Sequence, residues 1–122
     1  MAQNTAGQTL TYNVPQGSFA FAVGMDVIDS TSITAADYIE ITVGFKPKYV
    51  EWLNVTDRVG GEFYEGMAAN SCLKTVANGT RTLEITSGNG GITLTQTGFR
   101  VSQNATLALI LASKTCVWRA QS

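Results

Sequence analysis

Histidine is absent from the 122-residue sequence, and charged side chains are scarce, at 14% of the residues. Without histidine there is no Ser-His or Cys-His catalytic pair, and the commonest zinc ligand is missing. Eight Lys and Arg residues stand against nine Asp and Glu residues, with no basic run. Because a nucleic-acid-binding domain needs a basic face, nucleic acid is excluded as the principal partner. Neutral polar residues, chiefly Thr, Ser, Asn and Gln, supply the expected surface.

Long apolar runs are also missing, and cysteine is rare. No stretch approaches the ~18 apolar residues of a transmembrane helix, so no membrane partner is expected. The first eight residues lack the charged and apolar regions of a secretory signal, which predicts synthesis in a reducing cytosol. There, Cys72 and Cys116 are expected to be free thiols, with a bridge between two strands as the alternative.

Short alternating segments typical of β-strands recur along the chain, whereas helical spacing of apolar residues is rare. Turn residues separate these segments about every 8–12 residues, and Asn78-Gly79 is the strongest hairpin signal. The pattern predicts an all-β fold, either a sandwich or a barrel. Strands are expected over residues 9–14, 19–27, 38–43, 49–55, 62–67, 72–76, 81–85, 92–94, 98–101, 105–112 and 115–120, the last two as a hairpin around Ser113-Lys114.

The length predicts a single domain over residues 9–122, preceded by a short arm over residues 1–8. The arm is small, polar and uncharged, so it cannot form a packed element alone and is expected to be flexible.

Within the segment 19–27, Phe19, Phe21 and Val23 share one face, and Gly24 is expected to mark a bend or bulge.

The segment 49–55 is apolar on both faces, with Val50 and Trp52 on one face and Tyr49, Leu53 and Val55 on the other. A strand of this kind is buried on both sides, inside the domain or against a partner chain. Together with 62–67 it carries more apolar surface than one thin sandwich face needs, which predicts a homo-oligomer. The expected interface residues are Tyr49, Leu53, Phe63, Tyr64 and Met67.

Catalytic patterns are weak. Asp26 with Asp29, and Glu62 with Glu65, are close carboxylate pairs. Each pair is separated by an odd number of positions and would face opposite sides of a regular strand, whereas a glycosidase needs both carboxyls in one cleft. We therefore expect a protein that is not an enzyme, with no catalytic residue, no cofactor and no metal site.

The aromatic residues could form a sugar-binding platform, but core packing is the favoured interpretation: Tyr49, Trp52, Phe63, Tyr64, Phe99 and Trp118.

Residues 41–57 read ITVGFKPKYVEWLNVTD: an apolar strand, then Gly-Phe-x-Pro-x-Tyr-Val, then a strand that ends in Asn-x-Thr-Asp. This stretch resembles a segment of small virion proteins of tailed bacteriophages. The turn over residues 77–82 and the stretch over residues 91–99 also fit, so the resemblance spans about residues 38–102. The group is loosely defined and includes capsid decoration (cement) proteins.

The resemblance implies a β-sandwich of jelly-roll type that binds the outer surface of a phage head and stabilises it by bridging neighbouring subunits of the major capsid protein. It also implies a homo-oligomer, for which a trimer is favoured because a capsid lattice offers many three-fold sites; a dimer is the alternative. The arm is expected to contribute capsid-docking residues by strand addition: Ala2, Gln3, Asn4, Thr5 and Gln8. The alternative function is a tail-fibre or baseplate module that binds host surface glycans.

Overall fold

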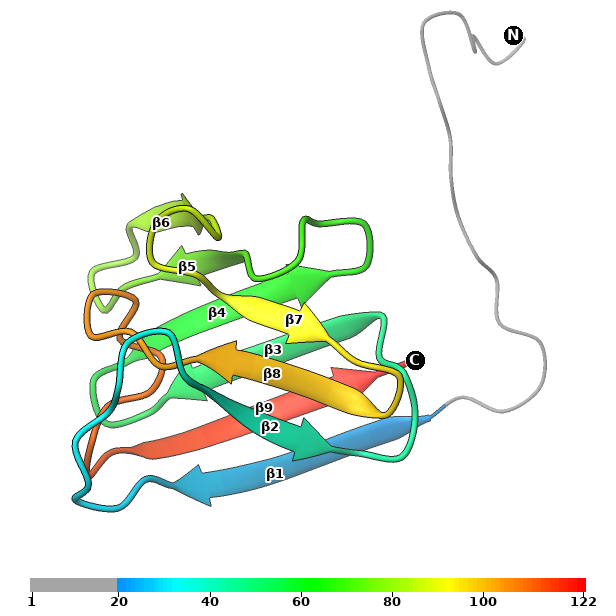
Figure 1. Ribbon diagram of the computed structural model, residues 1–122, viewed down its shortest axis with the longest axis horizontal. Coiled ribbons are helices and arrows are strands. Elements are labelled where there is room, and N and C mark those ends of the chain that lie inside the picture. Colours follow the sequence, from blue (N-terminus) through cyan, green and yellow to red (C-terminus); the bar gives the residue numbers. More distant parts are fainter. Residues whose placement is uncertain (1–19) are drawn as a thin grey trace, which may run out of the picture.

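The computed structural model describes residues 20–122, which form two antiparallel β-sheets packed against each other (Figure 1). The predicted β-sandwich is confirmed. The arm over residues 1–8 and the strand expected over residues 9–14 lie outside the described residues. No helix occurs between residues 20 and 122. The strands are β1 (Phe21–Val27), β2 (Tyr38–Thr42), β3 (Tyr49–Asn54), β4 (Val59–Tyr64), β5 (Cys72–Thr75), β6 (Arg81–Glu84), β7 (Ile92–Leu94), β8 (Gly98–Ser102) and β9 (Thr115–Gln121).

The two sheets are unequal in size. The larger has six strands in the order β1-β9-β3-β4-β5-β6, and the smaller has three in the order β2-β8-β7. Figure 1 shows β1 and β6 at opposite edges of the larger sheet. The connections β1–β2, β2–β3, β6–β7 and β8–β9 pass from one sheet to the other, as connections do in jelly rolls, while β3 to β6 follow one another as a meander.

The core lies between the sheets because alternate residues of each strand point inward. In β3, Val50, Trp52 and Asn54 are fully buried, whereas Tyr49 and Leu53 on the outer face are only half-buried. Within one chain β3 is therefore buried on one face only, and burial of its other face against a partner chain stays a prediction. The buried apolar side chains are Val50, Trp52, Val59, Phe63, Cys72, Ile92, Phe99, Val101, Leu107, Leu109, Ile110, Cys116 and Ala120.

The strand predicted over residues 105–112 is wrong, and so is the hairpin that would have joined it to the last strand. Residues 103–114 form an irregular loop in which Leu107, Leu109 and Ile110 are fully buried, so the apolar run fills the core without pairing. Side chains of the larger sheet donate hydrogen bonds to carbonyl oxygens of this loop. The Trp52 indole N–H donates to the Leu109 oxygen at 2.9 Å, and the Asn54 amide donates to the Ala108 oxygen at 3.1 Å.

Strand β9 pairs with β1 on one side and β3 on the other, instead of folding back on the residues just before it. Strand β4 begins at Val59, three residues earlier than expected, so the predicted loop over residues 56–61 is shorter. The hairpin at Asn78-Gly79 is confirmed, since β5 and β6 pair across it with Thr75 opposite Arg81.

The bend or bulge expected at Gly24 is wrong, because β1 pairs with β9 without interruption from Phe21 to Val27. Gly24 lies opposite Trp118, and a Cβ atom there would collide with the indole ring. The glycine therefore makes room for Trp118, which packs edge-on against Phe99 with ring centroids 5.5 Å apart. Absence of a side chain at this position serves packing between the sheets, and β1 stays a regular seven-residue strand.

The two cysteines are free and buried, as favoured from the sequence. Burial raises the pKa of the Cys72 thiol to about 12 and that of Cys116 to about 11, from a usual value near 9. The carboxylate of Glu84 adds to the increase at Cys72. Both thiols are therefore protonated at neutral pH, and neither is an activated nucleophile.

We expect both thiols to resist dithionitrobenzoate at pH 8 in the folded protein and to react fully after unfolding in guanidinium chloride.

The same pKa values predict a pH dependence of stability. In the unfolded chain the thiols ionise near pH 9, but in the folded chain they hold their protons up to about pH 11–12. The free energy of unfolding should thus be fully maintained below pH 9 and should fall as the pH rises above it. Rapid labelling of the native protein by dithionitrobenzoate would contradict the prediction that the thiols are protected.

Candidate interaction surface

A row of exposed apolar side chains runs along β1, on the face of the larger sheet that points away from the core. Phe21, Val23, Met25 and Val27 have exposed fractions of 52%, 63%, 68% and 63%. They are successive odd-numbered residues of a regular strand, so all four project from the same face. We call these four residues the β1 row.

The β1 row adjoins further apolar side chains on the neighbouring strands. Met25 is paired with Val117 of β9, which is paired in turn with Leu53 of β3. A shallow groove of about 550 Å³ follows the junction of β1 and β9 and is lined by Val23, Met25 and Val117. Scattered apolar residues are ordinary on a protein surface, but a contiguous set at a sheet edge is typical of an interaction site.

A network of charged and aromatic side chains borders the β1 row on the same face. Arg119 on β9 forms an ion pair with Glu51 at 3.3 Å, and its guanidinium lies 5.5 Å from the centre of the Tyr49 ring. The Tyr49 hydroxyl donates to Glu51 at 2.8 Å. Burial and this contact with Glu51 raise the pKa of Tyr49, so the phenol remains a donor across the physiological range. An apolar strip with a polar border is the usual composition of an interface.

The network continues across β4 to β6. Tyr49 and Tyr64 are neighbours on paired strands, with ring centroids 4.9 Å apart. The Tyr64 hydroxyl donates to Glu62 at 3.2 Å, and Arg81 pairs with the other oxygen of Glu62 at 3.1 Å. Each of these ion pairs is substantially exposed, so its contribution to stability is small. The two ion pairs hold the side chains of Arg81 and Arg119 over the sheet.

The five residues predicted for an oligomer interface do not share one surface. Tyr49, Leu53 and Tyr64 lie on the outer face of the larger sheet, as an interface there would require. Phe63 points inward and is 3% exposed, so it belongs to the core and offers no surface to a partner. Met67 follows β4 and packs against the core, with its sulfur accepting from the Tyr64 amide at 3.2 Å. The docking residues Ala2, Gln3, Asn4, Thr5 and Gln8 lie outside the described residues.

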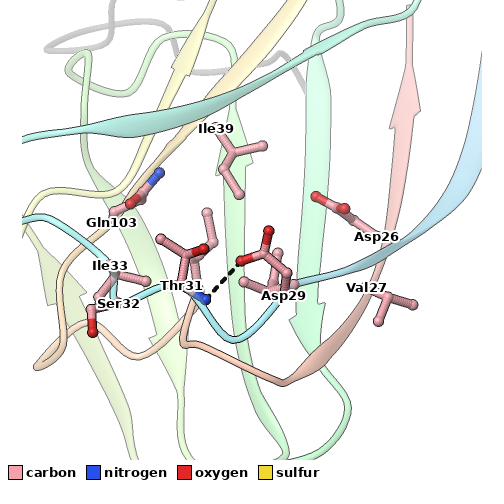
Figure 2. A pocket seen from close by; sticks show the side chains of 10 residues that line it. Asp26, Val27, Asp29, Thr31, Ser32, Ile33, Ile39 and Gln103 are labelled. Carbon is pink, nitrogen blue, oxygen red and sulfur yellow. Dashed lines mark hydrogen bonds between the residues drawn. The ribbon is translucent and has the colours of Figure 1, made fainter.

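Two carboxylates line one hollow near the end of β1 (Figure 2). Asp26 and Asp29 both line this space of about 260 Å³, with Ile39 and Gln103 among its other walls. The expectation that the pair would face opposite sides is wrong, because β1 ends at Val27 and Asp29 lies beyond the regular strand. Asp29 accepts from the Thr31 amide at 2.8 Å, which lowers its pKa. It is thus a carboxylate near neutral pH and unsuited to act as a general acid.

Within residues 20–122, no three His, Cys, Asp or Glu side chains come close enough to hold a metal ion. The same part of the chain has no helix that could cross a membrane. Comparison with known protein families, with curated proteins and with solved structures finds no match to this chain. The β1 row is therefore interpreted from its own geometry. The sequence contained its signal, since Phe21 and Val23 were placed on one face, but the expected bend at Gly24 ended the row too early.

Proposed function

We propose that the protein is a bacteriophage capsid decoration (cement) protein. It binds the major capsid protein on the outer surface of the head and bridges neighbouring subunits, so that separating them costs more free energy. Many copies acting together make even weak attachment effective. The proposal places the protein in the virion after its synthesis in the bacterial cytoplasm, with no role for nucleic acid, membrane or cofactor.

The observation that carries this proposal is the β1 row on the outer face of the larger sheet. A long strand edge with an apolar outer row suits attachment to another polypeptide, either a capsid subunit or a second copy of this chain, better than it suits a small substrate. The resemblance of residues 38–102 to small virion proteins favours the major capsid protein as the partner of the assembled protein. Under this proposal the chain self-associates, with the homotrimer and the homodimer as the two candidates, and the arm over residues 1–8 adds contacts to the capsid.

A specific feature favours the second candidate, a tail-fibre or baseplate module that binds host surface glycans. Tyr64 is exposed and stands beside Tyr49, and a groove of about 380 Å³ on the same face is lined by Glu51, Glu62 and Arg81. Aromatic rings next to planar polar groups are suited to sugar binding. The groove is open, and its carboxylates are already engaged with Arg81 and Arg119, which makes this the weaker proposal.

The location of the chain on a virion tests the proposal. Antibodies raised against the purified protein should label the heads of phage particles in immunogold electron microscopy, and mass spectrometry of purified virions should detect the chain in many copies. Heads stripped of the protein by mild denaturant should lose heat resistance and should regain it when the protein is added back. Label confined to tails would support the glycan-binding alternative, and absence of the chain from virions would overturn both.

A further inference from the structure

Strand β1 differs from the other edge strands of the described sandwich in length and in charge. It has seven residues, whereas β6, at the opposite edge of the same sheet, has four and carries Arg81 and Glu84. In the smaller sheet, β7 has three residues, and β2 carries Glu40 in an ion pair with Arg100. Short length and charged side chains are the usual means by which proteins protect a sheet edge from pairing. Strand β1 is longer than these edge strands, and the side chains on its outer face carry no charge.

The hydrogen-bonding groups of β1 follow a fixed phase. Ser122 N–H donates to the Ala20 oxygen and Ile28 N–H donates to the Lys114 oxygen, both at 2.9 Å. These pairs bracket the ladder, so the even-numbered residues of β1 exchange hydrogen bonds with β9. The N–H and C=O groups of Val23, Met25 and Val27 consequently point to the open edge, where the described part of the chain provides no further strand.

We propose that β1 pairs antiparallel with β1 of a second copy of this chain, so that two six-stranded sheets join into one continuous sheet. Such an interface is isologous: each copy presents the same strand, and a two-fold axis relates them. The register centred on Gly24 sets Val23 of one copy opposite Met25 of the other. Because both residues carry edge-directed groups, this register forms hydrogen-bonded pairs.

The same register also covers the β1 row. Residues paired across an antiparallel ladder project from the same face, so the two rows lie side by side and shield each other's apolar side chains. No like charges meet, since Asp26 points to the inner face and falls opposite Ala22 of the second copy. The edge charges of β6 disfavour a β1–β6 contact repeated around a ring. The geometry thus favours the homodimer over the homotrimer. This inference holds whether or not the protein is a virion component.

Sedimentation equilibrium of the full-length protein provides the test. We expect a dimer, and Val23→Lys should weaken it on the order of 100-fold, because symmetry brings two lysines into each interface. Val23 faces solvent in the single chain, so the variant should fold with unchanged circular dichroism and melting behaviour of the monomer. The matched control is Leu83→Lys on β6, where the exposed fraction of 61% is nearly that of Val23. It should leave the dimer intact.

A charge exchange tests the register itself. Met25→Glu alone should also dissociate the dimer, whereas the double variant Val23→Lys/Met25→Glu should restore it, since lysine and glutamate of different copies then stand opposite each other. A wild-type monomer at ~100 µM, the concentration at which weak specific dimers with a Kd near 10 µM are mostly assembled, would overturn the proposal and would leave the edge to residues 9–14 or to another protein. Equal dissociation by Leu83→Lys would also overturn it, in favour of a contact between unlike edges.

Discussion

Replacing Trp52 by alanine is expected to lower the free energy of unfolding by about 3–5 kcal/mol, as for other large buried aromatic residues. Trp52 is fully buried at the centre of β3 and packs edge-on against Phe99, with ring centroids 6.3 Å apart. Its indole N–H also holds the loop 103–114 through the Leu109 oxygen. The substitution therefore removes core volume and leaves that buried carbonyl without its principal donor. Urea unfolding followed by circular dichroism gives the value.

Trp52→Phe separates the two contributions. Phenylalanine keeps much of the ring but cannot donate to Leu109, so a loss of about 1–3 kcal/mol is expected from the smaller ring and from the lost hydrogen bond, since only the Cys116 thiol at 3.4 Å still donates to that carbonyl. Hydrogen exchange should report the loss locally, as faster exchange of amides in residues 105–112 before the sheets open. If Trp52→Phe proved as stable as the wild type, the hydrogen bond would have no part in fixing the loop.

Gly98→Ala is expected to destabilise the sandwich at the upper end of the roughly 1–3 kcal/mol typical of overpacking, or beyond it. Gly98 begins β8 opposite Thr42 of β2, and a Cβ atom there would overlap the backbone carbonyl of Ile41. A flexible side chain could move aside, but this obstacle is main chain inside a ladder. The pairing of β2 with β8 must therefore open locally to admit the methyl group.

Gly60→Ala is the matched control, since Gly60 is also a strand glycine but its added Cβ would meet Leu53 at 3.4 Å, an ordinary contact. Its effect on the free energy of unfolding should lie within about 0.5 kcal/mol of zero. Melting temperatures and urea midpoints of both variants measure the contrast. Comparable destabilisation by the two substitutions would show that the loss arises from glycine replacement in general, with no particular role for the close approach of β8 to β2.

Local patterns predicted most of the strands but not their neighbours. Alternation along 38–43, 49–55 and 81–85 identified β2, β3 and β6, because side-chain period follows directly from sequence. The partners of β9 could not be found this way, since pairing with β1 and β3 depends on contacts distant in the chain. Residues 105–112 misled for a related reason. Their apolar run fits a strand, but Trp52 and Asn54 bind their carbonyls and replace the ladder that a strand would need.

The candidate surface was predicted only in part, again for a reason of geometry. Tyr49, Leu53 and Tyr64 were placed correctly on a surface, but the inward direction of Phe63 follows from its pairing opposite the buried Val50, a register that local sequence does not fix. The Asp26 and Asp29 carboxylates share a hollow because the strand ends between them. Strand ends are the least certain feature of a sequence-based prediction, and the difference at the aspartate pair arises there.

Two residues of the motif over residues 41–57 have structural tasks. Asn54 is fully buried, and its amide donates to the Asp57 carboxylate at 3.0 Å while its oxygen accepts from the Asp57 amide at 3.2 Å. This closes the turn between β3 and β4. Pro47 is buried in the passage from β2 to β3, where the chain changes sheets. This motif thus specifies how the sandwich is joined, and the surface proposed to meet a partner lies elsewhere, on β1.

The position of β9 between β1 and β3 has a consequence for the order of folding. Ala20 and Ser122, which are joined by a hydrogen bond beside this ladder, are 102 residues apart in the chain. Closing so large a loop costs much conformational entropy before any contact repays it, and topologies of this kind fold slowly. Within the meander from β3 to β6, each strand pairs with the next one in the sequence, and such local pairing costs less loop entropy. Strand β1 precedes β9 by most of the described chain, so its apolar row has no β9 to pair with until synthesis reaches residue 115, and in that interval the unpaired strand is open to aggregation.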